Sequence, residues 1–272
     1  MSALPYGGRH ELGQNFLTDP AVIAAVCTAA SRTTGPLVEL AAGDGALTLP
    51  LSRTGRPVTA VELDPRRASR LARRTGANVE VVHGDLLRHR LPDVPHTVVG
   101  NLPFHLTTAA LRRLFRQRHW ELAVLLVQWE VARRRAGIGG ASQMTASWWP
   151  WFEFSVPAKV PAHAFRPRPA VDGGILVMAR RPEPLVENQA GYQEFVREVF
   201  TGRGRGLAGI LPRTGHLSAR AARNWLARHR LSPQALPRDL TAEHWASLWH
   251  LALHQRTRCS APESSAFPRP RP

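Results

Sequence analysis

The residues best suited to chemistry lie at positions 101–104, Asn-Leu-Pro-Phe. The Asn101 amide carries a carbonyl that accepts hydrogen bonds and an amino group that donates them. Pro103 fixes its own backbone φ and holds the turn rigid, and Phe104 supplies a flat aromatic face beside the amide. This combination predicts a site where a planar amine stacks on Phe104 while Asn101 holds its N–H groups. A structural turn with a core phenylalanine is the competing interpretation.

The elements around this turn would place it at the edge of a sheet. Residues 98–100, Val-Val-Gly, precede it, and apolar residues recur at helical spacing over 110–115. The pattern predicts a buried strand, a tight turn and a helix that Thr107 or Thr108 caps. In open α/β sheets, ligands bind at the carboxyl ends of the strands. The turn therefore lies where a substrate would bind.

A glycine-containing turn at 41–45 forms a second candidate site. Residues 37–40, Leu-Val-Glu-Leu, predict a short buried strand, and a helix is expected over 46–53. A strand, a glycine-rich turn and a helix form a cradle for a cofactor. Gly43 and Gly45 allow the backbone to approach the ligand closely. Because loops with two glycines are common, an ordinary surface turn is the alternative.

Two acidic residues follow the next strands. Glu62 comes after a strand at 57–61 and about 20 residues after the glycine turn, the spacing at which an acidic residue binds ribose hydroxyls. Asp85 follows a strand at 78–82, where its carboxylate would accept a hydrogen bond from an adenine amino group. A solvated loop carboxylate is the alternative interpretation for Glu62.

The remaining pattern predicts an α/β domain followed by helices. Three further strands are expected at 122–127, 152–160 and 174–179. Strands that alternate with helices indicate a mostly parallel, doubly wound sheet. A loop is expected over 136–151, and the aromatic run at 148–154 is more typical of a core than of a base-stacking surface. Beyond a linker at 180–184, helical spacing alone predicts a small all-helical domain.

The composition favours a polyanionic partner. The chain has 272 residues, with 36 Lys plus Arg against 20 Asp plus Glu, and Lys159 is its one lysine. The formal net charge of +16 indicates binding to nucleic acid or to an acidic membrane surface. Arg203 and Arg205 lie in a glycine-rich loop that either contacts phosphates or is simply disordered.

The sequence gives less support to a disulfide-rich, metal-binding, secreted or membrane-spanning protein. Cys27 and Cys259 suggest neither a disulfide framework nor a zinc cluster, and the 12 histidines lack metal-ligand spacing, so no metal site is expected. The first eight residues do not read as a signal peptide, and no apolar run is long enough to span a membrane. We expect a soluble, cytoplasmic protein without a membrane partner.

Six stretches carry a resemblance to a known family. They lie at 13–19, 39–48, 61–64, 84–86, 100–104 and 165–172. Together they resemble the rRNA adenine N6-methyltransferases, which use S-adenosylmethionine and include the Erm macrolide-resistance methylases and the small-subunit rRNA dimethyladenosine transferases. The run at 148–154 and the short helical domain are more similar to the Erm branch of actinomycete type. Ala41 stands where the family has glycine, which leaves open how closely that backbone approaches the cofactor.

The resemblance implies a fold and a division into domains. It implies a Rossmann-like class I methyltransferase sheet of seven mostly parallel strands, with a small C-terminal all-helical domain. The S-adenosylmethionine-binding catalytic domain would cover residues 1–180 and a helical RNA-binding domain residues 185–256. A disordered tail would cover residues 257–272.

The same resemblance assigns roles to individual residues. The residues implied around the cofactor are Gln14, Asn15, Leu17, Ala41, Gly43, Glu62, Leu63, Asp85, Leu86 and Asn101. Phe104 and Phe165 would stack the extruded adenine, while Asn101 and the Leu102 carbonyl accept its N6 hydrogens. The arginines expected to hold RNA phosphates are Arg112, Arg113, Arg116, Arg134, Arg166, Arg203 and Arg205.

The function implied is methylation of N6 of an adenine in 23S rRNA, in the peptidyl-transferase region of domain V, conferring macrolide resistance. A monomer that acts before ribosome assembly is complete is expected. A small-subunit 16S rRNA dimethyltransferase would use the same chemistry. A protein or DNA amino-methyltransferase would share the Asn-x-Pro-aromatic turn but not the Gln-Asn-Phe-Leu segment at 14–17. An RNA-binding relative without catalysis is the alternative from another class.

Overall fold

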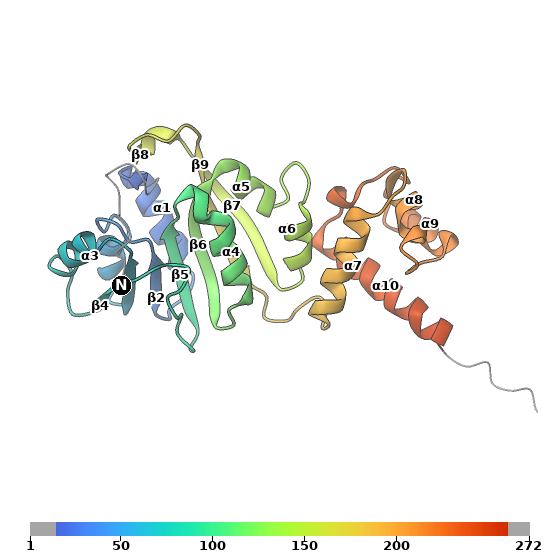
Figure 1. The fold of residues 1–272 in the computed structure, drawn as a ribbon, viewed down its shortest axis with the longest axis horizontal. Coiled ribbons are helices and arrows are strands. Elements are labelled where there is room, and N and C mark those ends of the chain that lie inside the picture. The colour runs from blue at the N-terminus through green and yellow to red at the C-terminus, as the bar shows by residue number, and fades with distance from the viewer. Residues whose placement is uncertain (1–14, 261–272) are drawn as a thin grey trace, which may run out of the picture. The chain divides into compact units, whose positions relative to one another are not determined.

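The structure is a computed structural model that describes residues 15–260, without the side chains of 256–260. The described chain forms two compact units (Figure 1). The first contains residues 15–139 and 152–182, and the second contains residues 140–151 and 183–260. No helix among the described residues has the length and hydropathy needed to cross a bilayer.

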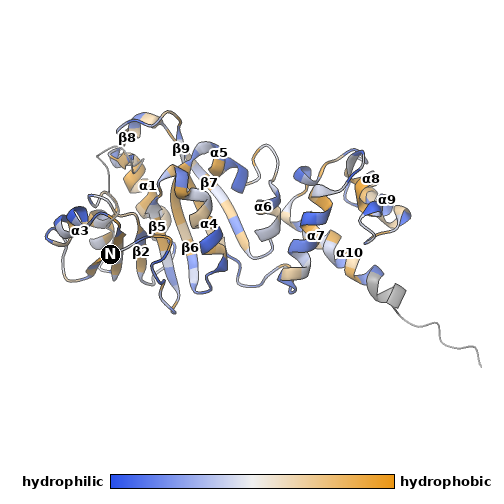
Figure 2. Cartoon of the chain, in the orientation of Figure 1, coloured by the Kyte–Doolittle hydropathy of each residue, from blue (hydrophilic) through white to orange (hydrophobic). Residues whose placement is uncertain are grey.

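The first unit is built on a seven-stranded sheet in the order β4-β3-β2-β5-β6-β9-β7. Its strands are β2 (Leu37–Leu40), β3 (Val58–Glu62), β4 (Val79–His83), β5 (His96–Asn101), β6 (Trp120–Gln128), β7 (Phe152–Val160) and β9 (Gly173–Arg180). The first five strands of this order pair in parallel, and β9 runs antiparallel to both β6 and β7. The predicted seven-stranded, mostly parallel sheet is confirmed. Its central strands are strongly apolar, as Figure 2 shows.

Helices of the first unit connect these strands. They are α1 (Pro20–Ala30), α2 (Thr48–Ser52), α3 (Pro65–Ala72), α4 (Thr107–Arg116) and α5 (Trp129–Arg135). Asp19 and Asp64 each accept two backbone N–H bonds at the start of a helix whose first residue is proline. This arrangement satisfies donors that the first turn leaves unpaired.

The predicted threonine cap of α4 is wrong. The short 3-10 helix η1 (Phe104–Leu106) precedes α4, so the chain already follows a helical path at Thr107. Leu106 occupies the cap position, and no side chain caps the helix. The Thr107 hydroxyl instead donates back to the Pro103 carbonyl, at 3.5 Å. This bond ties the helix to the turn that holds Asn101.

The second unit is helical and begins earlier than predicted. Its helices are α6 (Gln143–Trp148), α7 (Gln189–Thr201), α8 (Gly206–Arg213), α9 (Ala219–Arg228), η3 (Pro237–Asp239) and α10 (Ala242–Ser260). Residues 136–151 were expected to be a loop of the first domain, but α6 forms there and belongs to this unit. The reason is packing, because Ala146 is fully buried and its carbonyl accepts a 2.8 Å bond from the Tyr192 hydroxyl.

The boundaries at the end of the chain also differ from the prediction. Helix α10 continues to Ser260, four residues beyond the expected end at 256. The rest of the predicted tail, 261–272, lies outside the described residues. The aromatic run at 148–154 divides between the units, since Trp151 packs on Tyr192 and Phe152 stacks on Trp120. Both contacts support the core interpretation of that run.

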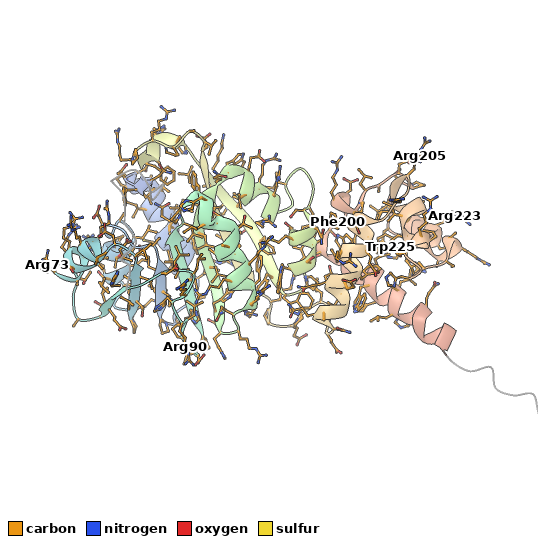
Figure 3. The ribbon with its side chains drawn as sticks, viewed as in Figure 1. Arg73, Arg90, Phe200, Arg205, Arg223 and Trp225 are labelled. Carbon is orange, nitrogen blue, oxygen red and sulfur yellow. The ribbon has the colours of Figure 1, made fainter. Side chains whose placement is uncertain are left out.

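Arginines cover much of the outer surface. Figure 3 shows Arg73 and Arg90 extending outward from the first unit, and Arg205 and Arg223 from the second. All four side chains are exposed. The positive charge is therefore available to a polyanionic partner.

Candidate active site

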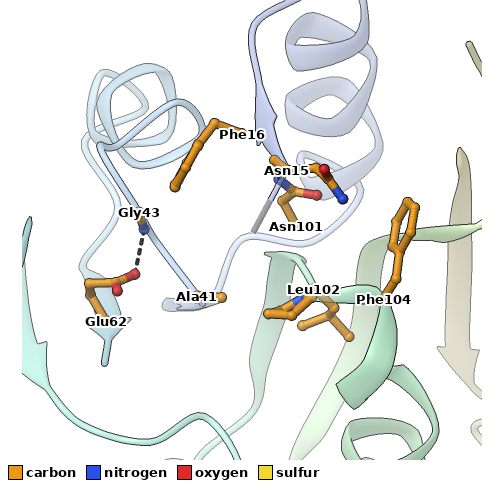
Figure 4. A pocket seen from close by; sticks show the side chains of 9 residues that line it. Asn15, Phe16, Ala41, Gly43, Glu62, Asn101, Leu102 and Phe104 are labelled. Carbon is orange, nitrogen blue, oxygen red and sulfur yellow. Dashed lines mark hydrogen bonds between the residues drawn. The ribbon is translucent and has the colours of Figure 1, made fainter. Parts of the chain in front are cut away.

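The carboxyl ends of β2, β3 and β5 meet at one pocket (Figure 4). It is lined by Asn15, Phe16, Ala41, Gly43, Glu62, Asn101, Leu102, Pro103 and Phe104. An adjoining pocket shares Ala41, Glu62 and Pro103 and adds Leu63, Asp85 and Leu86. The sheet thus brings together predicted cofactor and catalytic residues from segments far apart in the chain.

Two other predicted site residues, Phe165 and Leu17, are not among those that line the two pockets. Phe165 lies beside Phe104, with ring centroids 6.3 Å apart and an interplanar angle of 75°. Leu17 is buried in β1 (Phe16–Leu17), which pairs with β8 (Phe165–Arg166). Leu17 therefore packs in the core and, contrary to the prediction, is not among the residues that line either pocket. Gln14 lies outside the described residues.

Glu62 is held rigidly at the end of β3. It is 1% exposed, and its two carboxylate oxygens accept backbone N–H bonds from Gly43 at 2.7 Å and from Asp64 at 2.9 Å. Each carboxylate oxygen has a second lone pair that accepts another hydrogen bond. A carboxylate anchored in this way can bind the two hydroxyls of a ribose.

Ala41 adopts a left-handed backbone conformation, which favours glycine. Its φ is +62°, a region that costs a residue with a Cβ about 1–2 kcal/mol. Gly43 has a φ of +57°, and a Cβ there would lie 3.3 Å from the Phe16 ring. The backbone of the turn therefore still lies close to the pocket, although position 41 is an alanine.

The orientation of the Asn101 side chain follows from its hydrogen bond. Its amide nitrogen donates to the Asn15 carbonyl at 2.7 Å. Only the amino group can donate to a carbonyl, so the Asn101 side-chain oxygen is the atom left to accept from a substrate amine. The neighbouring Gly100 is required by packing, since a Cβ there would meet the Leu40 carbonyl oxygen at 2.6 Å.

The second pocket has the character of a base-binding site. Leu63 exposes 38% of its surface although it is apolar, and Leu86 is buried beside it. An Asp85 oxygen accepts a 2.8 Å bond from the Leu87 backbone N–H. Apolar side chains with one carboxylate suit a flat heterocycle that carries an amino group.

Sequence reasoning missed two groups near the pocket. Phe16 lines it and could have been found from its place within the Gln-Asn-Phe-Leu segment. Glu39 is 2% exposed in the middle of β2, and the Thr48 hydroxyl donates to it. Burial raises the pKa of Glu39 to about 8, and the nearby Glu62 charge also raises it.

The arginines predicted to bind RNA are mostly exposed. Arg112, Arg116, Arg134 and Arg166 are exposed in the first unit, and Arg203 and Arg205 in the second. Burial, followed by the charges of Arg134 and Arg112, lowers the pKa of Arg135 to about 10. Helices α4 and α5 therefore present neighbouring guanidinium groups.

Arg113 differs from the other arginines of this set. Its guanidinium donates to the Leu86 carbonyl at 2.6 Å and to the His89 carbonyl. Burial lowers its pKa. These bonds hold the loop that carries Asp85 and Leu86, so Arg113 serves the pocket rather than the outer surface.

The geometry agrees with the comparisons with known proteins. The family model described as "Ribosomal RNA adenine dimethylase" matches residues 7–252. The chain belongs to this family of S-adenosylmethionine-dependent enzymes and is an rRNA adenine N6-methyltransferase. The predicted family and activity are confirmed.

Individual relatives cover most of the chain. The mycinamicin-resistance protein MyrB of Micromonospora griseorubida is 54% identical over 97% of this chain and 85% of its own. An rRNA adenine N-6-methyltransferase of Corynebacterium diphtheriae is 52% identical over 77% of this chain and 85% of its own. The crystal structure of the 23S rRNA methyltransferase ErmE matches with a TM-score of 0.82 and 32% identity, covering 88% of this chain and 99% of that one. The class I methyltransferase fold is thereby confirmed.

Proposed function

We propose that the protein methylates N6 of an adenine in 23S rRNA and so confers macrolide resistance. The observation that carries this proposal is the Asn101–Phe104 turn, which faces the Glu62 carboxylate across one pocket. Similarity to a mycinamicin-resistance protein over nearly the whole chain supports the resistance, and similarity to the 23S rRNA methyltransferase ErmE supports the large-subunit target. We further propose that the substrate is domain V RNA, met by a monomer before ribosome assembly is complete.

The residues of the two pockets fit S-adenosylmethionine, which supplies a methyl group on a sulfonium. Glu62 would hold the ribose hydroxyls, and Asp85 the adenine amino group between Leu63 and Leu86. Asn15 and Gly43 would bind the methionine part, where a Cβ at position 43 would lie 3.3 Å from the Phe16 ring. The anchored Glu62 carboxylate contributes charge-assisted hydrogen bonds, which are stronger than neutral ones.

The target adenine must leave its stack at a cost of a few kcal/mol. Phe104 and Phe165 meet at an angle and would hold the extruded base by aromatic contact. The Asn101 side-chain oxygen and the Leu102 carbonyl would accept the two N6 hydrogens. Both bonds favour a pyramidal nitrogen whose lone pair leaves the ring and points toward the methyl donor. No strong base is required, because positioning dominates the rate and the N6 proton leaves after transfer.

Phosphate contacts would hold the rest of the RNA. The exposed arginines Arg112 and Arg116 of α4, Arg134 of α5 and Arg166 of β8 would make these contacts in the first unit, and Arg203 and Arg205 in the second. Such contacts supply affinity and register without selecting a sequence. The choice of adenine would then come from the shape of the RNA around the extruded base.

The test combines resistance with mapping of the methyl group. Sensitive bacteria that express the wild-type protein should survive erythromycin, and primer extension should stop at one adenine of 23S rRNA. Asn101→Ala should abolish both effects, because the amine loses the acceptor that aligns its lone pair. Asn224→Ala, at an exposed position of α9, is the matched control and should retain both. A methyl group on small-subunit rRNA without resistance would establish the 16S alternative instead.

A further inference from the structure

Phe16 lies over the glycine turn of the proposed cofactor site. Its Cε1 and Cδ1 atoms lie 3.3 and 3.4 Å from the position a Cβ would take on Gly43. The ring belongs to β1, a two-residue strand that pairs with β8. Leu17 is buried and Thr18 donates to the Ala164 carbonyl, so the segment is anchored after Phe16. The Phe16 ring itself is partly exposed, and a contact from outside the strand helps to keep it in place.

Arg67 of α3 supplies that contact. Its guanidinium carbon lies 4.2 Å from the centroid of the Phe16 ring, within the range of a cation–π interaction. The same guanidinium forms an ion pair with Asp44 in the glycine turn and lies 3.6 Å from an Asp64 oxygen. Two carboxylates therefore fix its position and balance its charge.

Arg70 provides a natural comparison on the same helix. It also pairs with Asp44, at 3.3 Å, but its side chain is 57% exposed whereas that of Arg67 is 22% exposed. Partial removal from water strengthens a cation–π contact. Arg67 thus contacts the glycine turn, the start of α3 and the Phe16 ring, whereas Arg70 pairs with Asp44 of the turn.

The segment that carries Phe16 also reaches the catalytic turn. The carbonyl of Asn15 accepts the hydrogen bond that orients the Asn101 amide. A displacement of Phe16 would therefore move the partner of Asn101. Figure 4 shows Phe16 beside Gly43 and Asn15 beside Asn101 at the same pocket.

We propose that Arg67 is a positioning residue that holds Phe16 as a cover over bound S-adenosylmethionine, an inference that rests on the proposed cofactor site. Arg67 need not touch the cofactor. It retards cofactor release by keeping the ring over Gly43, and it keeps the Asn15 carbonyl in register with Asn101.

Cofactor release from the full-length protein tests this role without RNA or methyl transfer. Radiolabelled S-adenosylmethionine is bound, chased with excess unlabelled cofactor, and counted on filters with time. Arg67→Met keeps apolar contact with Phe16 but removes the charge, and it should raise the release rate about threefold to tenfold. Arg70→Ala, the matched control, should change the rate less than about twofold.

A double variant shows whether Arg67 acts through Phe16. Phe16→Leu should also speed release, and the combined variant should be no faster than the faster single variant, because both remove one contact. Multiplying effects, or an unchanged rate in Arg67→Met, would overturn the role of Arg67 and leave the methylation proposal standing. A wild-type protein that binds no cofactor would contradict the proposed function itself. Unaltered urea midpoints confirm that each variant is folded.

Discussion

At the scale of single residues, the site depends on backbone conformation as much as on side-chain chemistry. Ala41 has a φ of +62° and Gly43 one of +57°, and a Cβ at position 43 would also be in tight contact with Phe16. The alanine therefore carries conformational strain without obstructing the pocket. At Glu62 the backbone acts on a side chain, because two backbone N–H groups bind the carboxylate and fix its orientation.

Ala41→Gly should stabilise the protein by about 1 kcal/mol, because glycine adopts a positive φ without strain. The measurement is the free energy of unfolding in urea. Gly43→Ala is the comparison, and it should destabilise the protein because its Cβ meets Phe16 at 3.3 Å. A loss of stability in Ala41→Gly would show that the left-handed conformation is not strained.

Glu62→Gln should weaken S-adenosylmethionine binding by about 1.5–3 kcal/mol. The amide loses the charge, and its amino group faces a backbone N–H that the carboxylate had bound. Isothermal titration calorimetry measures the change, with Glu80→Gln at an exposed position of β4 as the control. Unchanged affinity in Glu62→Gln would mean that another group binds the ribose.

At the scale of secondary-structure elements, β2 carries a buried acid through the centre of the sheet. Burial raises the pKa of Glu39 to about 8 from an ordinary value of 4.5. Its folded-state pKa thus exceeds its unfolded-state pKa, so the folded state binds the proton more tightly. The stability this group contributes is complete below pH 4.5 and is lost as the pH rises through 8.

Relative to Glu39→Gln, the wild type should lose free energy of unfolding between pH 5 and pH 8 by up to about 1.4 kcal/mol per pH unit, since the amide does not titrate. Burial lowers the pKa of His89, His96 and His229, so these groups raise stability with pH equally in both proteins. Urea unfolding of both proteins at unit pH intervals measures the difference in slope. Cys27, whose pKa is raised above 9.0 by burial, does not titrate in this window. An equal slope in the variant and the wild type would show that Glu39 is ionised in the folded protein.

At the scale of the whole molecule, charge governs how the protein meets RNA. A formal net charge of +16 is spread over both units, and each phosphate contact releases counterions. Affinity for rRNA should consequently fall steeply with salt. We expect the exposed arginines on α4 and α5 to direct this affinity to the pocket.

Replacing Arg112 and Arg116 with alanine should reduce the slope of log affinity against log salt by about 0.7–0.9 per lost contact. Filter binding of an rRNA fragment over a salt series measures it. The control replaces Arg32 and Arg90, which are exposed and precede β2 and β5, at the sheet edge away from the pocket. Equal slopes in both double variants would place the RNA elsewhere.

The sequence alone determined what depends on neighbouring residues. The strands predicted at 37–40 and 152–160 match the observed bounds of β2 and β7, and motif residues such as Glu62 and Asn101 already indicated the pocket. Contacts between distant segments were decided only by tertiary structure. The Ala146 carbonyl of α6 accepts a hydrogen bond from Tyr192 of α7. Arg113 donates to the Leu86 carbonyl, and the Arg67 guanidinium stacks on the Phe16 ring. No local pattern encodes these contacts, because each forms only when the folded chain brings the two segments together.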